Sequence, residues 1–551
     1  MTKPIKDSQK PQREPSWWSK YWFYTVLISL AVIGVPSAFF VPPIIPGLAN
    51  DGNTIVSVRQ GILAVLAGAL TMLTLSETHR KNTHEKDKND RDHTRQVYAE
   101  RRSRYTAAVE QLANEKAAVR LGGIYTLVGL ADEWLADDSL AEDKQKEEGQ
   151  VIINNLCSYI RSPFPVAEEI EEYEAHQELE DLQKTESEMF SEGESSRLQV
   201  LLKRFEDSDE YEKPKDITAD YAKFHEEQDV RRTIFVEMSK RSSTFTKNDK
   251  GEIIETVPGI WSDFDFDFSR APIFYPLSSL TIEKGNFSSA KFYSNADFIG
   301  TAFTQNANFN RVTFTQNANF NRATFAQNAN FSWAKFTQDA NFSRATFTQN
   351  ANFSWAKFNK IMLFVKATFN NEAHFGEATF NKIAGFGETI FNNEAHFSKA
   401  FFNKGAYFGE TTFNHESHFG ETIFRDFAHF GKATFTGNVD FGGAEFSERA
   451  NFWSAEFSGD ANFKDSYFAK YAPIFSGDSG VARFSTRVNW ADINFSVRSE
   501  SQPIKLGSAT LGDKTFSIPF GTVVFDPDSW DEKTEEYAHT SVTCCKIYRS
   551  P

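Results

Sequence analysis

Residues 329–347 read ANFSWAKFTQDANFSRATF, and the spacing of Phe in this stretch decides the fold of the second half of the chain. Phe occupies positions 331, 336, 342 and 347, so steps of five and six residues alternate. The alternation runs without a break from Phe287 to Phe468, and all 34 of its positions are Phe. The true period is therefore eleven residues.

A small or short residue, usually Ala, stands two places before each Phe of this ladder. Residues i and i+2 of an extended chain point to the same side, so the interior alternates small and large side chains. A helical solenoid is excluded as the main alternative, because inward residues five and six apart do not keep to one helix face and because Asn, Gly and Thr are poor helix formers. Burial of each Phe contributes about 1.5–3 kcal/mol, so the ladder needs no catalytic or cofactor-binding explanation.

Motifs such as the one quoted above resemble the pentapeptide-repeat family, in which a small residue and a central Leu or Phe point into a right-handed quadrilateral β-helix. The resemblance implies a β-solenoid whose remaining residues face outward. This chain departs from the family pattern by one extra residue in every second repeat, which implies coils of 22 residues instead of the usual twenty. The extra residue has to be absorbed at a corner or bulge if Phe is to keep facing inward.

If a coil holds 22 residues, residues 22 apart stack, and one outward column then contains His374, His396 and His418 in successive coils. These imidazoles would lie about 5 Å apart, close enough to couple on protonation or to share a metal. The sequence shows no acidic or Cys partner that would complete a metal site. We therefore predict no metal, and interpret the column as an exposed polar stack that is a candidate pH-sensitive element.

Two further columns change character along the solenoid, from basic to mixed. Residues 300–360 hold six basic residues and one acid, Asp339, whereas residues 361–470 hold an excess of acids. Exposed Trp beside Arg is the commonest chemistry of a binding hot spot, which predicts a partner-binding patch in the basic part. Its candidate residues are Arg311, Arg322, Trp333, Arg344 and Trp355. The alternative is an ordinary charged face on which aromatic stacking fixes the register.

Two apolar runs, residues 21–41 and 55–75, are long enough to span a membrane as helices. Arg59 near the start of the second run can reach back to the interface, so a pore is less favoured than an anchor. Five basic residues precede the first run and nine more lie between Arg80 and Arg104. Because cytoplasmic loops collect Lys and Arg, we predict a hairpin in the plasma (inner) membrane with both termini and the β-helix in the cytoplasm. A cleaved signal peptide in place of the first run is the alternative, but no A-x-A-like site follows it.

The middle of the chain is predicted to be helical. The segments RYTAAVEQL, VRLGGIYTLVGLADEWL and VIINNLCSYIRSPF, within 104–164, resemble a segment that precedes the β-helix in actinobacterial membrane-anchored pentapeptide-repeat proteins. This resemblance implies architecture rather than activity, and Cys157 fits there as a small buried residue. Residues 77–104 form either a solvated helix continuing from the second span or a flexible linker.

Residues 166–240 hold 23 acids against 10 bases, which accounts for most of the net charge of −16. This composition favours a solvated, partly helical connector, with an acidic interaction segment as the alternative. Its end, DVRRTIFVEMSKR, resembles the helix that caps the first coil in the same relatives. Such a helix would shield the open edge of the solenoid.

The period breaks at Tyr471, and we interpret the segment SIPFGTVVFDPDSWDEKTEEY as a cap or tail rather than another coil. Cys544 and Cys545 are too isolated to predict lipid modification or redox activity. We therefore predict, in order, a basic N-terminus (1–20), a transmembrane hairpin (21–76), a charged stalk (77–104), a small helical unit (105–164), an acidic connector with a capping helix (165–240), a lead-in to the solenoid (241–286), a regular β-helix (287–475) and a C-terminal cap and tail (476–551).

The function predicted from these patterns is a membrane-anchored scaffold or interaction module that presents its outer face to a protein partner or to itself, without a cofactor. An enzyme is not predicted, because no Ser/His/Asp order, Walker loop, GxGxxG or HExxH motif is present. The alternative implied by some pentapeptide-repeat relatives is a DNA-mimicking protein that binds topoisomerases. That role needs a strongly negative surface, whereas acids and bases nearly balance over residues 283–470, and we expect no nucleic-acid partner.

Overall fold

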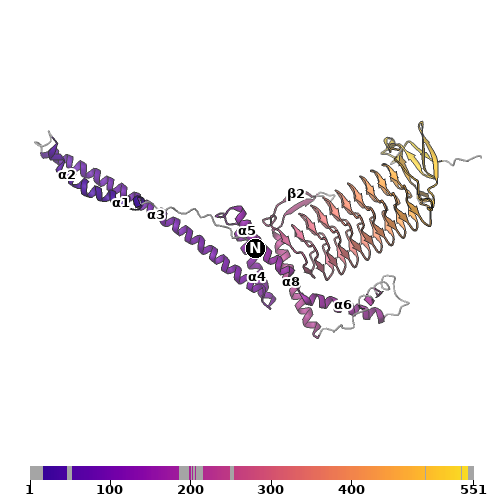
Figure 1. Cartoon of the computed structure of the whole chain (residues 1–551), viewed down its shortest axis with the longest axis horizontal. Helices are drawn as coiled ribbons and strands as arrows, with labels where there is room; N and C mark the ends of the chain where they lie inside the picture. Colours follow the sequence, from indigo (N-terminus) through magenta and orange to yellow (C-terminus); the bar gives the residue numbers. More distant parts are fainter. Residues whose placement is uncertain are drawn as a thin grey trace, which may run out of the picture. The chain divides into compact units, whose positions relative to one another are not determined.

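The structure is a computed structural model that divides into two compact units, residues 1–103 and 104–551 (Figure 1). Each unit is described by itself. The residues that the structure describes are 17–45, 52–184, 198–199, 201–202, 205, 215–247, 253–478, 480–490, 492–534 and 536–543. Cys544 and Cys545 lie outside these ranges.

The first unit is a pair of apolar helices. One is built from α1 (Trp17–Ser29), a π-helical turn η1 (Leu30–Gly34), α2 (Val35–Phe40) and a short 3₁₀ turn η2 (Pro42–Ile44); the other is α3 (Gly52–Leu112). The π-helical turn lies just before Pro36, whose ring removes one N–H and clashes with the carbonyl four residues back. Gly34 lets the two helices approach, because a Cβ there would lie 2.7 Å from a methyl group of Leu66.

Both helices are long and apolar enough to cross a membrane, in the segments Tyr21–Phe40 and Asn53–Leu112. Their apolar side chains remain exposed; Phe40 and Met72, for example, are 70% and 76% exposed. The Arg59 guanidinium lies over the Phe39 ring, 4.9 Å from its centre. Helix α3 continues unbroken through residues 77–104, so the stalk is a helix and not a flexible linker.

The predicted α-helical middle region is present in the second unit. It comprises the end of α3, then α4 (Ala117–Leu135), α5 (Glu142–Arg161), α6 (Pro165–Lys184) and α8 (Ile217–Arg241). Cys157 is buried on α5, as predicted, and burial raises the pKa of its thiol to about 12. The thiol is therefore neutral and serves as a core residue.

Helix α8 lies at the N-terminal end of the β-helix, where the sequence predicts a capping helix (Figure 1). Phe235 on α8 packs against Phe268 of the first coil, with ring centres 4.6 Å apart. Ser239 Oγ accepts a hydrogen bond of 2.8 Å from the backbone N–H of Thr281. The helix thus covers the first Phe layer and satisfies an open strand edge.

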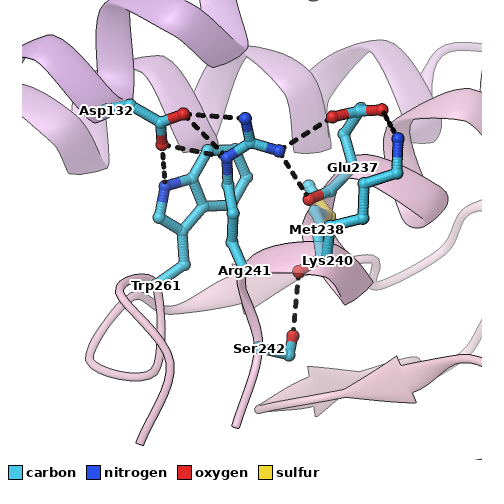
Figure 2. Close-up of polar contacts among 7 residues, drawn as sticks. All are labelled: Asp132, Glu237, Met238, Lys240, Arg241, Ser242 and Trp261. Atoms are coloured by element: carbon cyan, nitrogen blue, oxygen red, sulfur yellow. Dashed lines mark hydrogen bonds and ion pairs between the residues drawn. The ribbon is translucent and has the colours of Figure 1, made fainter.

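A polar cluster around Arg241 ties α4, α8 and the segment leading into the first coil together (Figure 2). The Arg241 guanidinium donates to both carboxylate oxygens of Asp132, at 2.7–2.9 Å, and to Glu237 at 2.8 Å. Trp261 Nε1 donates to the same Asp132 carboxylate at 2.9 Å, and the guanidinium lies over the Trp261 ring. Charge-assisted, bidentate contacts of this kind fix one geometry between the helical region and the solenoid.

The β-helix has four sides, each a parallel sheet of short strands. One coil contains β10 (Ala307–Asn308), β11 (Thr313–Phe314), β12 (Ala318–Asn319) and β13 (Thr324–Phe325), and each strand pairs with the strand 22 residues further on. Sheet 1 runs from β3 (Phe266–Asp267) to β38 (Ala461–Asn462), sheet 2 from β4 (Pro272–Ile273) to β39 (Tyr467–Phe468), sheet 3 from β8 (Ala296–Asp297) to β36 (Ala450–Asn451), and sheet 4 from β5 (Thr281–Ile282) to β48 (Thr540–Val542). The predicted 22-residue coil is therefore confirmed.

Each Phe of the ladder is buried, with at most 2% of its surface exposed. Rings one coil apart stack face to face; Phe309 and Phe331, for example, have centres 4.7 Å apart and nearly parallel planes. Rings from opposite parts of a coil meet edge to face, as Phe309 and Phe320 do at 5.7 Å. The two arrangements fill the interior with the pair geometries that aromatic rings prefer.

The Phe stack extends beyond the predicted range 287–475 at both ends. Phe268 stacks on Phe287 through a shorter first coil, in which β3 pairs with β6 (Gly285–Asn286). At the other end Phe475, Phe484 and Phe495 stack on Phe452, Phe457 and Phe463. A further, irregular coil therefore precedes the cap, and its longer corner loops explain why the period is lost in the sequence.

The cap closes this last coil with β42 (Arg483–Ser485), β45 (Val523–Phe525) and the antiparallel strand β48, all in sheet 4. Four two-stranded ribbons complete the strands of the described residues: β1 (Thr244–Lys247) with β2 (Ile253–Val257), β43 (Leu506–Leu511) with β44 (Lys514–Pro519), and the short pairs β40 (Ser476–Gly477) with β41 (Gly480–Val481) and β46 (Trp530–Asp531) with β47 (Glu536–Tyr537).

Candidate interaction surface

The corners of the β-helix decide which side chains reach farthest into solvent. The turn between sheets 1 and 2 places one residue of each coil in the left-handed region, and Arg311, Trp333 and Trp355 occupy this position with φ of 56°, 61° and 57°. A non-glycine residue there costs about 1–2 kcal/mol. The buried Phe on either side of the turn compensates for that cost and holds the corner in place.

Trp333 and Trp355 form an exposed aromatic stack on this corner. Their ring centres are 5.2 Å apart, their planes are inclined by 7°, and the residues are 51% and 40% exposed. Large apolar rings that are half exposed have unsatisfied contact area. The stack is therefore an accessible contact surface; whether it also fixes the register, as in the alternative interpretation, stays a prediction.

Two lysines that sequence reasoning missed lie beside this stack. Lys335 and Lys357 are the outward residues of the neighbouring strands β15 (Lys335–Phe336) and β19 (Lys357–Phe358) of sheet 2, and both are exposed. None of the ion pairs among the described residues involves Arg311, Lys335 or Lys357. The signal was present in the sequence as the repeated SWAKF at 332–336 and 354–358, in which Lys follows Trp by two residues.

Arg322 and Arg344, predicted to belong to the same patch, lie elsewhere. They occupy the turn between sheets 3 and 4, also with positive φ, whereas the Trp corner joins sheets 1 and 2. These corners are opposite each other in the four-sided coil. The predicted five-residue patch is therefore wrong as a single surface: Arg311, Trp333 and Trp355 stay together and the other two arginines are separate.

A groove of about 690 Å³ lies at the corner between sheets 2 and 3. It is lined by the lysines Lys360, Lys382 and Lys404, by the acids Glu178, Asp339 and Asp426, and by Ile361 and Ile383, which are 38% and 40% exposed. The charges at this corner are therefore mixed. We call the surface made of Arg311, Trp333, Lys335, Trp355 and Lys357 the basic face.

The later coils neutralise their own corner charges. Along the column of Arg311 and Trp333, Lys399 pairs with Glu421 at 3.8 Å. Along the column of Arg322, Lys366 pairs with Glu388 at 3.3 Å, and Lys432 pairs with Glu410 at 2.9 Å. In these two columns the corners therefore change from Arg311, Arg322 and Arg344, which belong to none of the ion pairs among the described residues, to ion pairs between coils further on.

The His column lies on the outer side of sheet 1. The rings of His374, His396 and His418 stack with centres 4.7 and 4.8 Å apart, and each residue is half-buried. Burial lowers the pKa of His396; His374 and His418 lower it further, whereas Glu394 and Glu372 raise it.

The expectation that no acidic partner accompanies the His column is wrong. Glu372 lies 3.1 Å from His374, Glu394 lies 3.2 Å from His396, and Glu416 lies 3.7 Å from His418. Each Glu precedes its His by two residues, so an extended backbone directs both side chains to the same side. The triplets Glu-Ala-His and Glu-Ser-His in the sequence were the signal that could have revealed this arrangement.

The rest of that column shows two uses of Asn. Asn308 donates a 3.0 Å hydrogen bond to Asn286 one coil earlier, as expected for stacked Asn. Asn308, Asn330 and Asn352 also accept a hydrogen bond from the backbone N–H two residues on and so stabilise their own corner turn.

Comparison with known proteins gives one family. The model for pentapeptide repeats, in nine copies, matches residues 309–356, 364–412 and 419–466. No curated protein matches the chain, and no solved structure does.

Proposed function

Since the chain is a pentapeptide-repeat protein, we propose that it is a membrane-anchored interaction module that binds an acidic, extended segment of a protein partner on its basic face. The observation that carries this proposal is the exposed Trp333–Trp355 stack beside Arg311, Lys335 and Lys357, cations that belong to none of the ion pairs among the described residues. A pentapeptide-repeat β-solenoid supports an interaction module in general terms, and the basic face specifies the partner's chemistry.

The partner is expected to be acidic because Arg311, Lys335 and Lys357, which belong to none of the ion pairs among the described residues, repeat positive charge from coil to coil. Consecutive coils are about 4.8 Å apart, so the lysines of the basic face form rows rather than a single site. An extended segment with several carboxylates can contact such rows together, while an apolar or aromatic side chain packs on the Trp stack. Such binding should weaken with salt, because exposed charges are screened within about 10 Å at 0.1 M ionic strength.

The membrane part of the proposal rests on the two apolar helices and on the charges at their ends. Both helices expose large apolar side chains, which a bilayer would cover. Lys and Arg precede the first span and follow the second, which favours cytoplasmic ends and a cytoplasmic β-helix. The hairpin then serves as an anchor that holds the protein at the membrane.

The DNA-mimicking alternative gains no support from the outer surface. Several of the acids that enrich residues 361–470 pair with lysines of adjacent coils, for example Glu388 with Lys366 and Glu410 with Lys432. A DNA mimic needs rows of uncompensated negative charge. Pairs of this kind reduce the negative charge of the later coils.

The test compares capture by three versions of the detergent-solubilised full-length chain immobilised on beads. Trp333→Ser with Trp355→Ser removes the stack, and Lys335→Glu with Lys357→Glu reverses the adjacent charge. The chain itself places Ser at equivalent corners with positive φ, at Ser289 and Ser454, so the Ser variant should keep the fold. We expect both double variants to retain at least tenfold less of an acidic partner from solubilised membranes, and the wild type to lose it as salt is raised.

The matched control is Lys399→Ser with Glu421→Ser, two residues of the same corner column in the later coils. It should capture the partner as the wild type does. Equal capture by all variants would contradict the proposed surface, and a topoisomerase among the captured proteins would favour mimicry. Protease treatment of spheroplasts tests the sidedness: a β-helix that is cleaved only after lysis is cytoplasmic, and cleavage in intact spheroplasts would contradict this orientation.

A further inference from the structure

On the outer side of sheet 1, two positions of the coil carry a different pair of residue types in three consecutive coils. The earlier coils carry Asn at both, for example Asn328 and Asn330 in one coil and Asn350 and Asn352 in the next. The following three coils carry Glu at the first position and His at the second. The paired residues are Glu372 and His374, Glu394 and His396, and Glu416 and His418, and we call this set the Glu–His ladder. The two interior positions beside the pair remain Ala or Ser and Phe, so the interior does not require the change.

The ladder contains two groups of three residues whose metal-binding atoms lie close together. One oxygen of Glu372 and one ring nitrogen each of His374 and His396 lie within 4.8 Å of one another, and the same holds for Glu394, His396 and His418. Each triad joins two neighbouring coils, and His396 belongs to both. The residues are half-buried, so their backbones are fixed by the sheet while their tips are accessible.

We propose that the Glu–His ladder binds one divalent transition-metal ion, of the Zn²⁺ class, between adjacent coils. Imidazole with carboxylate is a donor set that Zn²⁺, Co²⁺, Ni²⁺ and Cu²⁺ accept, whereas Mg²⁺ and Ca²⁺ require oxygen ligands. Three protein ligands leave a fourth position for water or for a donor from another molecule. Because His396 is common to both triads, the ladder holds one tightly bound ion rather than two.

Binding requires a small local movement that the site permits. Two nitrogens bound to the same Zn²⁺ at about 2.1 Å lie no more than about 4.2 Å apart, so the stacked rings must tilt toward each other. The next outward position along each strand is Gly376, Ser398 or Gly420, which leaves the space beside the rings free of large side chains. A Cβ built on Gly376 would meet nothing closer than 3.6 Å. Rotation about the His side-chain bonds is therefore sufficient, without a change in the coil.

The metal would act as a cross-link between coils, in addition to strand pairing, ring stacking and polar contacts such as the one between Lys399 and Glu421. It lies on the coils that follow Trp355, and its test does not depend on any partner binding to the basic face. A ligand that binds only the folded chain stabilises it in proportion to the logarithm of its concentration over its dissociation constant. Loading with Zn²⁺ should therefore raise the unfolding temperature of the β-helix.

The experiment titrates the full-length chain in detergent, purified without a histidine tag, with Zn²⁺ alone and with Co²⁺ alone. Calorimetry gives the stoichiometry, and the visible absorption of Co²⁺ reports nitrogen ligation. We expect one tight equivalent. His374→Asn should retain it through the second triad and His418→Asn through the first, whereas His396→Asn should weaken binding at least 100-fold because it removes a ligand from both.

Asn is the residue that the chain itself carries at this position in four earlier coils, so the variants should fold, which circular dichroism verifies. His429→Asn is the matched control, since His429 lies on sheet 3 beside Phe427 and outside the ladder; it should bind Zn²⁺ like the wild type. The proposal is overturned if the wild type takes up no tight equivalent, if His396→Asn binds Zn²⁺ as tightly as the wild type, or if Mg²⁺ binds equally well.

Discussion

The coils of residues 300–360 and those of residues 361–470 share one interior and present two different exteriors. Inside, both contain the same Phe stacks, with rings about 5 Å apart in each part, as between Phe320 and Phe342 or Phe408 and Phe430. Outside, the earlier coils carry Arg311, Lys335 and Lys357 without ion pairs, while the later coils pair Lys432 with Glu410 and Lys366 with Glu388.

This difference shows that the solenoid separates folding from recognition more completely than a globular core does. The inward residues of each coil are nearly invariant along the chain, and they alone set the register. The outward residues can then change together over a few coils, as the Trp stack and the Glu–His ladder do. Function should therefore map to blocks of coils rather than to single residues.

The largest expected effect tests whether the interior is the same in both parts. Phe342→Ala and Phe430→Ala each remove a fully buried ring from the middle of the same column, and each should destabilise the β-helix by about 3–5 kcal/mol. Thermal or denaturant unfolding followed by circular dichroism measures the loss. The two losses should agree within about 1 kcal/mol, because the cost of such a substitution depends on the surroundings of the cavity and equivalent rings surround both.

A matched control is Phe→Leu at the same two positions, which keeps much of the buried volume and should cost clearly less than Ala. If one Ala variant loses much more stability than the other, the two parts do not share an equivalent interior, and the separation of folding from recognition is contradicted. Substitutions of Trp333 and Trp355 should cost far less than either Phe, because these rings are half exposed.

The interior was predictable from the sequence because it depends on a single, repeated constraint. A Phe at every ladder position fixes which residues point inward, and the 22-residue coil follows from four sides with alternating five- and six-residue steps. The irregular coils at the two ends were not predictable, since Phe475, Phe484 and Phe495 reach the stack through loops of different lengths.

The outer surface was predictable only in part, for two physical reasons. Arg311 and Arg322 are one eleven-residue period apart and look equivalent in the sequence, but half a coil separates them, so they lie at opposite corners. Glu372 and His374 are two residues apart, and a comparison of columns alone does not show that they touch. Contacts within a column follow from the period, whereas contacts between columns require the shape of the coil.

A smaller effect tests the backbone of the corners. Arg322 holds a left-handed conformation with φ of 57°, which glycine adopts without penalty and alanine does not. Arg322→Gly should therefore be more stable than Arg322→Ala by about 1 kcal/mol. Glu388 occupies the equivalent corner of the later coils with φ of 55°, and Glu388→Gly compared with Glu388→Ala should give the same difference. Both Glu388 variants lose the contact to Lys366, so that loss cancels when the Gly variant is compared with the Ala variant. If the Gly–Ala difference in stability at residue 388 were not equal to that at residue 322, the corners would depend on their surface charges.

The smallest expected effect concerns the ion pairs that distinguish the later coils. Lys432→Met removes the partner of Glu410, 2.9 Å away, and should change the unfolding temperature at pH 7 by no more than about 1 °C, because exposed pairs contribute little. The hydrogen bond and charge of Lys432 lower the pKa of the Glu410 carboxyl. Any stabilisation is therefore complete above the ordinary Glu value of 4.5 and disappears as the pH falls through the lower value of the folded chain.

The pH series measures the unfolding temperature of the wild type and Lys432→Met from pH 7 to pH 3, with Arg344→Met of the earlier coils as control. The small difference between wild type and Lys432→Met should vanish at the acid end, and Arg344→Met should show no such pH dependence, because Arg344 belongs to none of the ion pairs among the described residues. A large, pH-dependent loss in Lys432→Met would mean that the surface pairs help to hold the coils together. The later coils would then use their charges for stability, whereas the earlier coils leave theirs available for a partner.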